Sequence, residues 1–63
     1  MRYKSYTIKE LSSGWCIIKN NDIFVARTID LSEARRYIWL QLKGTKDEVE
    51  MITQEMIEEG VLK

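Results

Sequence analysis

The chain has 63 residues, one cysteine and no histidine, and its ten basic and ten acidic side chains cancel to a formal net charge of zero. This composition excludes an internal disulfide and a zinc site built from cysteine and histidine, and it leaves no imidazole for acid–base catalysis. A domain this short buries only about 60% of the surface that its unfolded chain exposes, so association with another chain is the expected supplement to a small core.

Three strands are predicted in the first half of the chain. YKSYTIKEL, residues 3–11, alternates roughly between apolar and polar side chains, which is the pattern of a half-exposed strand. A turn at residues 12–14 (SSG) leads to WCIIK at 15–19, and a tight turn at residues 20–21 (NN) leads to IFVART at 23–28. These segments predict a three-stranded antiparallel meander.

Two helices are predicted in the second half. Asp30 has the chemistry of a helix N-cap, and the helical period follows it over residues 31–43. A second capping box begins at Thr45 and precedes a helix over residues 47–59. The predicted fold class is therefore α+β, a three-stranded antiparallel β-meander followed by two α-helices (βββαα), in a single domain over residues 1–63.

Side-chain alternation divides the predicted strands into two faces, if the second turn is at Asn20 and Asn21. The more uniformly aliphatic face is the predicted core and holds Ile8, Cys16, Ile18, Ile23, Val25 and Ile29. The second face is amphipathic and holds Leu11, Trp15, Ile17, Phe24 and Ala26, with Lys9, Lys19, Thr7 and Thr28 among them. A slip of one residue in the register would exchange the two faces.

The first predicted helix is expected to cover the core face through Leu31, Ala34, Ile38 and Leu42. Trp39 borders this stripe, and Leu40 lies on nearly the opposite side. The short connection at Gly44 and Thr45 favours a second helix folded back on the first, with Trp39 or Leu40 as its docking position. Alternatively, the second helix swings round or reaches a neighbouring chain. Met51 faces away from the second helix's own apolar stripe.

Charge is distributed unevenly along the chain. Residues 1–46 carry nine bases and four acids, whereas residues 47–63 carry one base and six acids. The acids of the second predicted helix form a solvated outer face or dock on the basic body. Helical acids at this spacing do not predict a metal site.

No enzyme activity, cofactor or metal is expected, because motifs that carry chemistry are missing. The sequence has no glycine-rich phosphate loop and no EF-hand spacing. Cys16 is expected to be a small buried apolar residue. No segment approaches the roughly 20 apolar residues of a membrane span, and no apolar leader follows Met1, so a cytoplasmic protein without membrane contact is expected.

The predicted function is non-catalytic protein interaction, with self-association as a homodimer. The apolar side chains outside the core exceed what so small a monomer can cover, and such surfaces mark interfaces. The predicted interface residues are Leu11, Trp15, Ile17 and Phe24 on the second sheet face and Trp39, Leu40 and Met51 on the helices. The alternative for both tryptophans is a place in the core. A phage or mobile-element accessory protein that acts on a host factor also fits a chain of this size.

Nucleic-acid binding through the sheet is the alternative function. Basic side chains on a sheet can contact phosphates while aromatic and polar ones reach base edges, and the candidate contacts are Lys9, Lys19, Arg2 and Lys4. The βββα order over about residues 3–42 resembles the small sheet domains of AP2-type DNA-binding proteins and of some mobile-element integrase amino-terminal arms. The resemblance is one of architecture, without a diagnostic motif, and the acidic second helix lies outside it.

Overall fold

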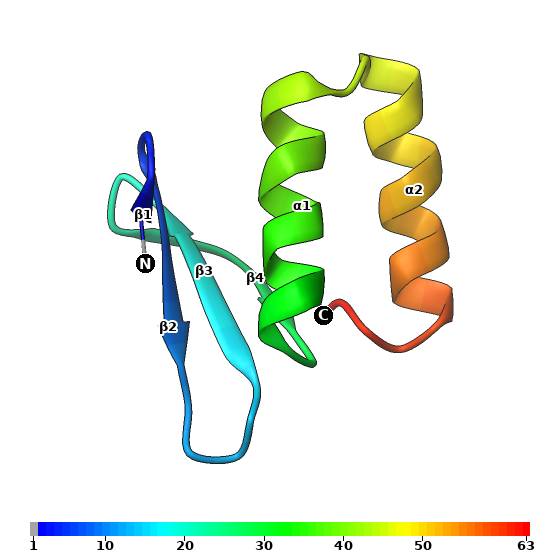
Figure 1. Ribbon diagram of the computed structural model, residues 1–63. Helices are drawn as coiled ribbons and strands as arrows, with labels where there is room; N and C mark the ends of the chain where they lie inside the picture. The colour runs from blue at the N-terminus through cyan, green and yellow to red at the C-terminus, as the bar shows by residue number, and fades with distance from the viewer. Residues whose placement is uncertain (1) are drawn as a thin grey trace.

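The computed structural model describes residues 2–63, with the side chain of Arg2 outside that description. The elements follow in the order β1 (Arg2–Tyr3), β2 (Tyr6–Glu10), β3 (Cys16–Asn20), β4 (Ile23–Thr28), α1 (Leu31–Lys43) and α2 (Lys46–Glu58). The strands form one antiparallel sheet in the order β1-β2-β3-β4. Figure 1 shows α1 beside the sheet and α2 on the side of α1 away from it. The predicted α+β fold, an antiparallel meander followed by two helices, is confirmed.

The first predicted strand, residues 3–11, is divided by a tight turn that the sequence did not indicate. Tyr3 pairs with Tyr6, and Lys4 between them has φ 55°. This left-handed conformation is uncommon for a residue with a Cβ, and neither glycine nor asparagine signals the turn. The chain therefore gains the two-residue β1 at the edge of the predicted meander.

The hairpin between β2 and β3 has the predicted register. Ile8 pairs with Ile18, Lys9 pairs with Ile17, and the Leu11 N–H donates to the Trp15 carbonyl at 2.8 Å. Because the register is as expected, the core and solvent sides of these two strands are also as expected.

The hairpin between β3 and β4 differs from the prediction, which placed its turn at Asn20 and Asn21. The turn is one residue later, because Asn21 (φ 53°) and Asp22 (φ 66°) both adopt the left-handed conformation of a type I′ hairpin. Asn20 is then a strand residue and pairs with Ile23. The predicted register for this hairpin is wrong.

A register shift between Ile18 and Lys19 also changes which side of β4 faces the core. Lys19 pairs with Phe24, but Ile18 pairs with Ala26, so Val25 is an extra, bulged residue. Ala26 and Thr28 are buried, at 4% and 0% exposed. Three residues that the sequence placed in the core are exposed instead, namely Ile23 at 71%, Val25 at 40% and Ile29 at 43%.

The carboxyl-terminal segment, residues 61–63, returns to the sheet and lies along the outer edge of β4. The Arg27 N–H donates to the Lys63 carbonyl at 2.9 Å, and the Lys63 N–H donates to the Arg27 carbonyl at 2.7 Å. Leu62 forms an antiparallel bridge with Thr28 and is 4% exposed. The segment therefore covers part of the sheet edge and adds an apolar side chain to the core.

The core lies between the sheet and the helices. Its buried residues are Ile8, Cys16, Ile18, Ala26, Ala34, Tyr37, Ile38, Met56 and Leu62. Helix α1 contacts β2, β3, β4 and α2. The second helix thus packs on the first and leaves the other face of the sheet open, which decides between the arrangements that the sequence allowed.

Both predicted helix caps are present. An Asp30 side-chain oxygen accepts from the Glu33 N–H at 2.9 Å, and the Thr45 hydroxyl accepts from the Glu48 N–H at 3.2 Å. Each bond satisfies a backbone donor that has no partner within its own helix. Within the described part of the chain, no helix has the length and apolar character needed to cross a membrane.

Candidate functional site

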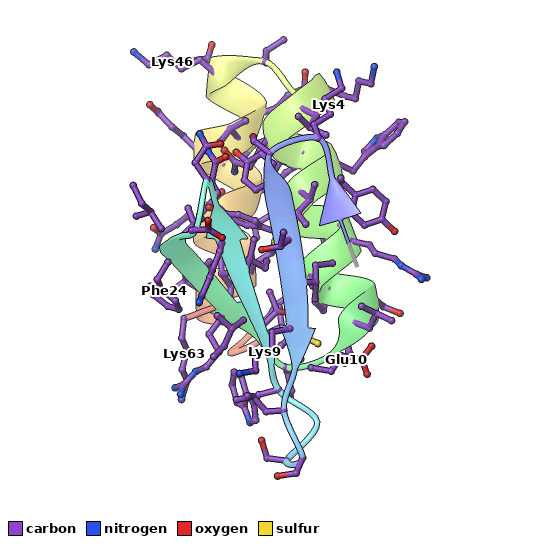
Figure 2. The ribbon with its side chains drawn as sticks, turned by 90° about the vertical axis from the view of Figure 1, so that its left-hand side faces the viewer. Lys4, Lys9, Glu10, Phe24, Lys46 and Lys63 are labelled. Atoms are coloured by element: carbon purple, nitrogen blue, oxygen red, sulfur yellow. The ribbon has the colours of Figure 1, made fainter. Side chains whose placement is uncertain are left out.

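The sheet surface turned away from α1 is the first candidate site, and we call it the open face. Residues paired across neighbouring strands share a side of the sheet. The side that faces α1 is marked by its buried residues, which are Ile8, Cys16, Ile18, Ala26 and Thr28. The open face comprises Thr7, Lys9, Leu11, Trp15, Ile17, Lys19, Phe24, Arg27 and Lys63. Figure 2 looks toward this side of the molecule, with the helices behind the sheet.

Three cations form a row across the open face. Lys9 pairs with Ile17, Ile17 pairs with Arg27, and Arg27 exchanges two backbone hydrogen bonds with Lys63. Neighbouring strands lie about 4.8 Å apart, so Lys9 is about 10 Å from Arg27 at the backbone and Lys63 is one strand further. The side chains of Lys9, Arg27 and Lys63 are exposed, so the row presents positive charge to the solvent.

The indole of Trp15 makes cation–π contacts with two of these cations. The Arg27 guanidinium carbon lies 4.9 Å from the ring centroid, and the Lys63 ammonium nitrogen lies 5.2 Å from it. Both distances are within the range of cation–π attraction, which restrains the two side chains. Trp15 itself is half-buried and is therefore neither a core residue nor a freely exposed one.

A second aromatic side chain stands at the other end of the open face. Lys19 pairs with both Thr7 and Phe24, and the Phe24 ring is 58% exposed. Trp15 and Phe24 therefore flank the row of cations. Figure 2 labels Phe24, Lys9 and Lys63 on this side of the sheet.

The open face carries no acidic residue. Glu10 pairs with Cys16, whose side chain is buried, so it belongs to the other side of the sheet. Within residues 2–63, Arg36 forms an ion pair with Glu33 at 3.4 Å, but no Asp or Glu side chain pairs with an open-face cation. The acids of α2 belong to a layer beyond α1 (Figure 1). The neutral chain therefore has segregated charges.

The predicted interface residues do not form one surface. Leu11, Trp15, Ile17 and Phe24 lie on the open face as expected, whereas Trp39 on α1 and Met51 on α2 are 66% and 59% exposed elsewhere. Leu40 is only 7% exposed. It does not belong to an exposed surface, because it lies where α2 packs on α1; of the two docking positions that the sequence allowed, Leu40 is the buried one.

The predicted nucleic-acid contacts are also divided. Lys9 and Lys19 lie on the open face. Lys4 is in the turn between β1 and β2, at the end of β2 opposite Lys9 (Figure 2), and the side chain of Arg2 lies outside the described residues. Arg27 and Lys63 were missed. Alternation with Val25 and Ile29 would have placed Arg27 on the predicted core face, and a charged residue there was the signal that the register of this hairpin was wrong.

The thiol of Cys16 is not a reactive group in the fold. Its side chain is 1% exposed. Burial raises the pKa of the Cys16 thiol, and the negative charges of Glu10 and Asp30 raise it further, so the nucleophilic thiolate is disfavoured. In the described part of the chain, no group of three or more His, Cys, Asp or Glu side chains is placed to hold a metal ion.

Comparison of the chain with models of known protein families, with curated proteins and with solved structures finds no match. The inference of function therefore depends on the surfaces of the molecule.

Proposed function

We propose that this protein is a non-catalytic nucleic-acid-binding protein whose open face docks on the phosphate backbone. The observation that carries the proposal is the row of Lys9, Arg27 and Lys63, in which Trp15 restrains two of the three cations. Basic side chains held on a sheet supply phosphate contacts, which dominate the affinity of such complexes.

The aromatic residues favour nucleic acid over an acidic protein surface. Phe24 offers an exposed ring on which a base can stack, and stacking on aromatic side chains accepts any base. An extended row of cations with few hydrogen-bond acceptors suits a regularly spaced polyanion. The proposal therefore predicts weak sequence preference, because no polar side chains are clustered to read base edges.

Net neutrality is compatible with this function because the charges lie in different layers. The acids of α2 are separated from the open face by the sheet and α1 (Figure 1). A nucleic acid on the open face would meet the cations first, and the acidic helix would point away from it. The effect of charges beyond about 10 Å is largely screened at physiological salt.

Self-association through the open face is disfavoured by the same charges. A two-fold symmetric contact would place Lys9, Lys19, Arg27 and Lys63 against their own copies, and like charges across an interface are costly. The open face as a whole is therefore better matched to a polyanion than to a second open face.

Fluorescence anisotropy with labelled single-stranded and duplex DNA and RNA, over a range of salt, tests the proposal. If three or four phosphates are contacted, the logarithm of the duplex association constant should fall with log salt with a slope of about −2.7 to −3.6. Arg27→Ala and Lys9→Ala should weaken binding and make the slope shallower by about one each.

Lys46→Ala is the matched control, because Lys46 is an exposed lysine at the start of α2 and lies far from Lys9 in Figure 2. It should bind as the wild type does. Absence of binding to all four probes at low salt, or equal losses in Lys46→Ala and Lys9→Ala, would overturn the proposal.

A further inference from the structure

We infer that two copies of this chain pair through the exposed sides of α1 and α2, with Trp39 of each copy against Met51 of the other. This inference uses residues outside the open face and does not depend on nucleic-acid binding.

Trp39 is exposed at the centre of a basic surface on α1. Its side chain is 66% exposed, and residues three and four positions away on a helix are its surface neighbours. These neighbours include Arg35, Arg36 and Lys43, and the Lys43 ammonium lies 5.8 Å from the ring centroid. Because the indole is exposed, Trp39 contributes little to the core of the monomer, and another role is needed to explain it.

Two grooves flank Trp39. One, of about 450 Å³, lies toward the sheet and includes Tyr3 and Leu42 in its walls. The other, of about 230 Å³, lies between the helices, with Leu40 and Ile52 in its walls. The indole therefore forms a ridge with an apolar recess on each side, and a partner side chain can fill the recess between the helices.

Met51 is the acidic counterpart on α2. It is 59% exposed, and its neighbours three and four positions away include Asp47, Glu48 and Glu55. None of these three carboxylates is in an ion pair within residues 2–63; Glu48 accepts a hydrogen bond from the Thr45 hydroxyl at 3.0 Å. A flexible apolar side chain among acids thus faces outward.

Trp39 and Met51 border the same side of the helix pair. The groove between the helices is lined by Arg36, Trp39 and Lys43 from α1 and by Glu48 and Ile52 from α2. Met51 directly precedes Ile52 and lies one turn from Glu48. The side of the molecule around this groove is therefore basic along α1, acidic along α2 and apolar at two exposed points.

The levels of these residues match along the antiparallel helices. The connection is short, because only Gly44 and Thr45 separate the two helices. It is also tightly packed, since a Cβ built on Gly44 would lie 2.9 Å from the Leu40 side chain and 3.4 Å from that of Val49. With a rise of about 1.5 Å per residue in each helix, residues equally distant from Thr45 in sequence lie at about the same level. Three such pairs are Lys43 with Asp47, Trp39 with Met51, and Arg35 with Glu55.

Two copies related by a two-fold axis parallel to the helices would form a dimer in which these matched residues meet. Such an axis lays α1 of each copy on α2 of the other without changing the level of any residue. Each basic residue then faces an acid of the partner copy, each indole faces a methionine, and every contact occurs twice. This charge complementarity favours a second copy over an unrelated partner, and the contact closes without forming a filament.

Sedimentation velocity over micromolar to millimolar concentrations tests the dimer with paired charge reversals. Arg35→Glu and Glu55→Lys should each weaken self-association at least tenfold, because each places like charges at both copies of the contact. Both changes suit the helix dipoles, since the acid is near the start of α1 and the base near the end of α2, and circular dichroism of each variant checks the fold.

An equimolar mixture of the two variants is the decisive measurement. In a mixed dimer, the new carboxylate of the Arg35→Glu chain faces the new ammonium of the Glu55→Lys chain, and the second contact is wild type, so dimerisation should return. Trp39→Ala should weaken dimerisation both in the wild-type chain and in the equimolar mixture. Glu50→Lys, on another side of α2, is the control and should leave the wild-type constant unchanged.

The inference would be overturned by a wild-type chain that stays monomeric at millimolar concentration, by a mixture that associates no better than its components, or by an equal loss in Glu50→Lys. A wild-type monomer that binds an acidic helical peptide through Trp39 would assign this side of the molecule to a different partner and would also overturn it.

Discussion

The Arg27 guanidinium carbon lies 4.9 Å from the centroid of the Trp15 ring, although the two residues are twelve positions apart in the sequence. The bulge at Val25 makes this contact possible, because it turns Arg27 to the open face and Ala26 to the core. Arg27 is therefore the residue of the proposed site whose side chain is best pre-organised to bind a phosphate.

Trp15→Ala should weaken nucleic-acid binding about three- to tenfold, because loss of the ring releases the Arg27 and Lys63 side chains and leaves their charges in place. Trp15→Phe keeps a smaller aromatic ring, so its affinity should lie between those of the wild type and of Trp15→Ala. Anisotropy at a fixed low salt concentration measures the effect, and circular dichroism checks the fold. Wild-type affinity in Trp15→Ala would show that the cation–π contacts do not contribute to binding.

Thr28→Val should lower the free energy of unfolding by about 1 kcal/mol. The Thr28 hydroxyl is buried and donates to the Asp30 carbonyl at 2.9 Å, and valine removes this bond without changing the volume much. Urea denaturation measures the loss. Thr7→Val on the open face is the control and should change stability by less than about 0.5 kcal/mol; an equal loss there would refute a specific role for the Thr28 hydroxyl.

Leu62→Ala should lower the free energy of unfolding by about 2 to 4 kcal/mol, because it leaves a cavity where the carboxyl-terminal segment enters the core. The urea midpoint of the variant should fall accordingly. Ile57→Ala is the comparison, since Ile57 is 49% exposed on α2 and its truncation should cost much less. Equal midpoints in the two variants would mean that the segment is not held against β4 in solution.

Stability should fall at alkaline pH because of Cys16. Its pKa is raised in the folded chain, so above about pH 8.5 the unfolded chain loses the thiol proton first and is stabilised relative to the folded one. The contribution of the protonated Cys16 thiol to the free energy of unfolding is therefore complete at neutral pH and is lost as pH rises. Burial also raises the pKa of Tyr37, which adds a similar loss above about pH 10.

Urea midpoints measured from pH 7 to pH 10 in the wild type and in Cys16→Ala separate the two groups. The variant should be less stable at pH 7, because of its cavity, but should lose less stability than the wild type between pH 8 and pH 10. Parallel pH profiles would contradict the assignment to Cys16.

Local chemistry made the helices and the first hairpin predictable. Asp30 and Thr45 satisfy backbone donors within three residues of themselves, and Gly14, at φ 97°, supplies the conformation that its turn requires. Such signals act between neighbours in sequence, so they hold whatever the rest of the chain does.

The second hairpin was not predictable from local chemistry, because Asn20, Asn21 and Asp22 offer two equally good turns. Packing made the choice. The observed register with its bulge buries Ala26 and Thr28 beneath α1 and places Arg27 in solvent, whereas the predicted one would have put a guanidinium in the core at a prohibitive cost of desolvation. That choice also determined which cations share the open face.

The sequence by itself determined the order of a meander followed by two helices, the capped helix ends, the absence of histidine and the separation of basic body from acidic end, because each depends on residue type and short-range contacts. Only the tertiary structure decided that residues 61–63 pair with β4, that α2 packs on α1, and that Trp15 contacts both Arg27 and Lys63 in the proposed site. These features depend on contacts between residues distant in sequence, and their free energy is gained only when the whole core closes.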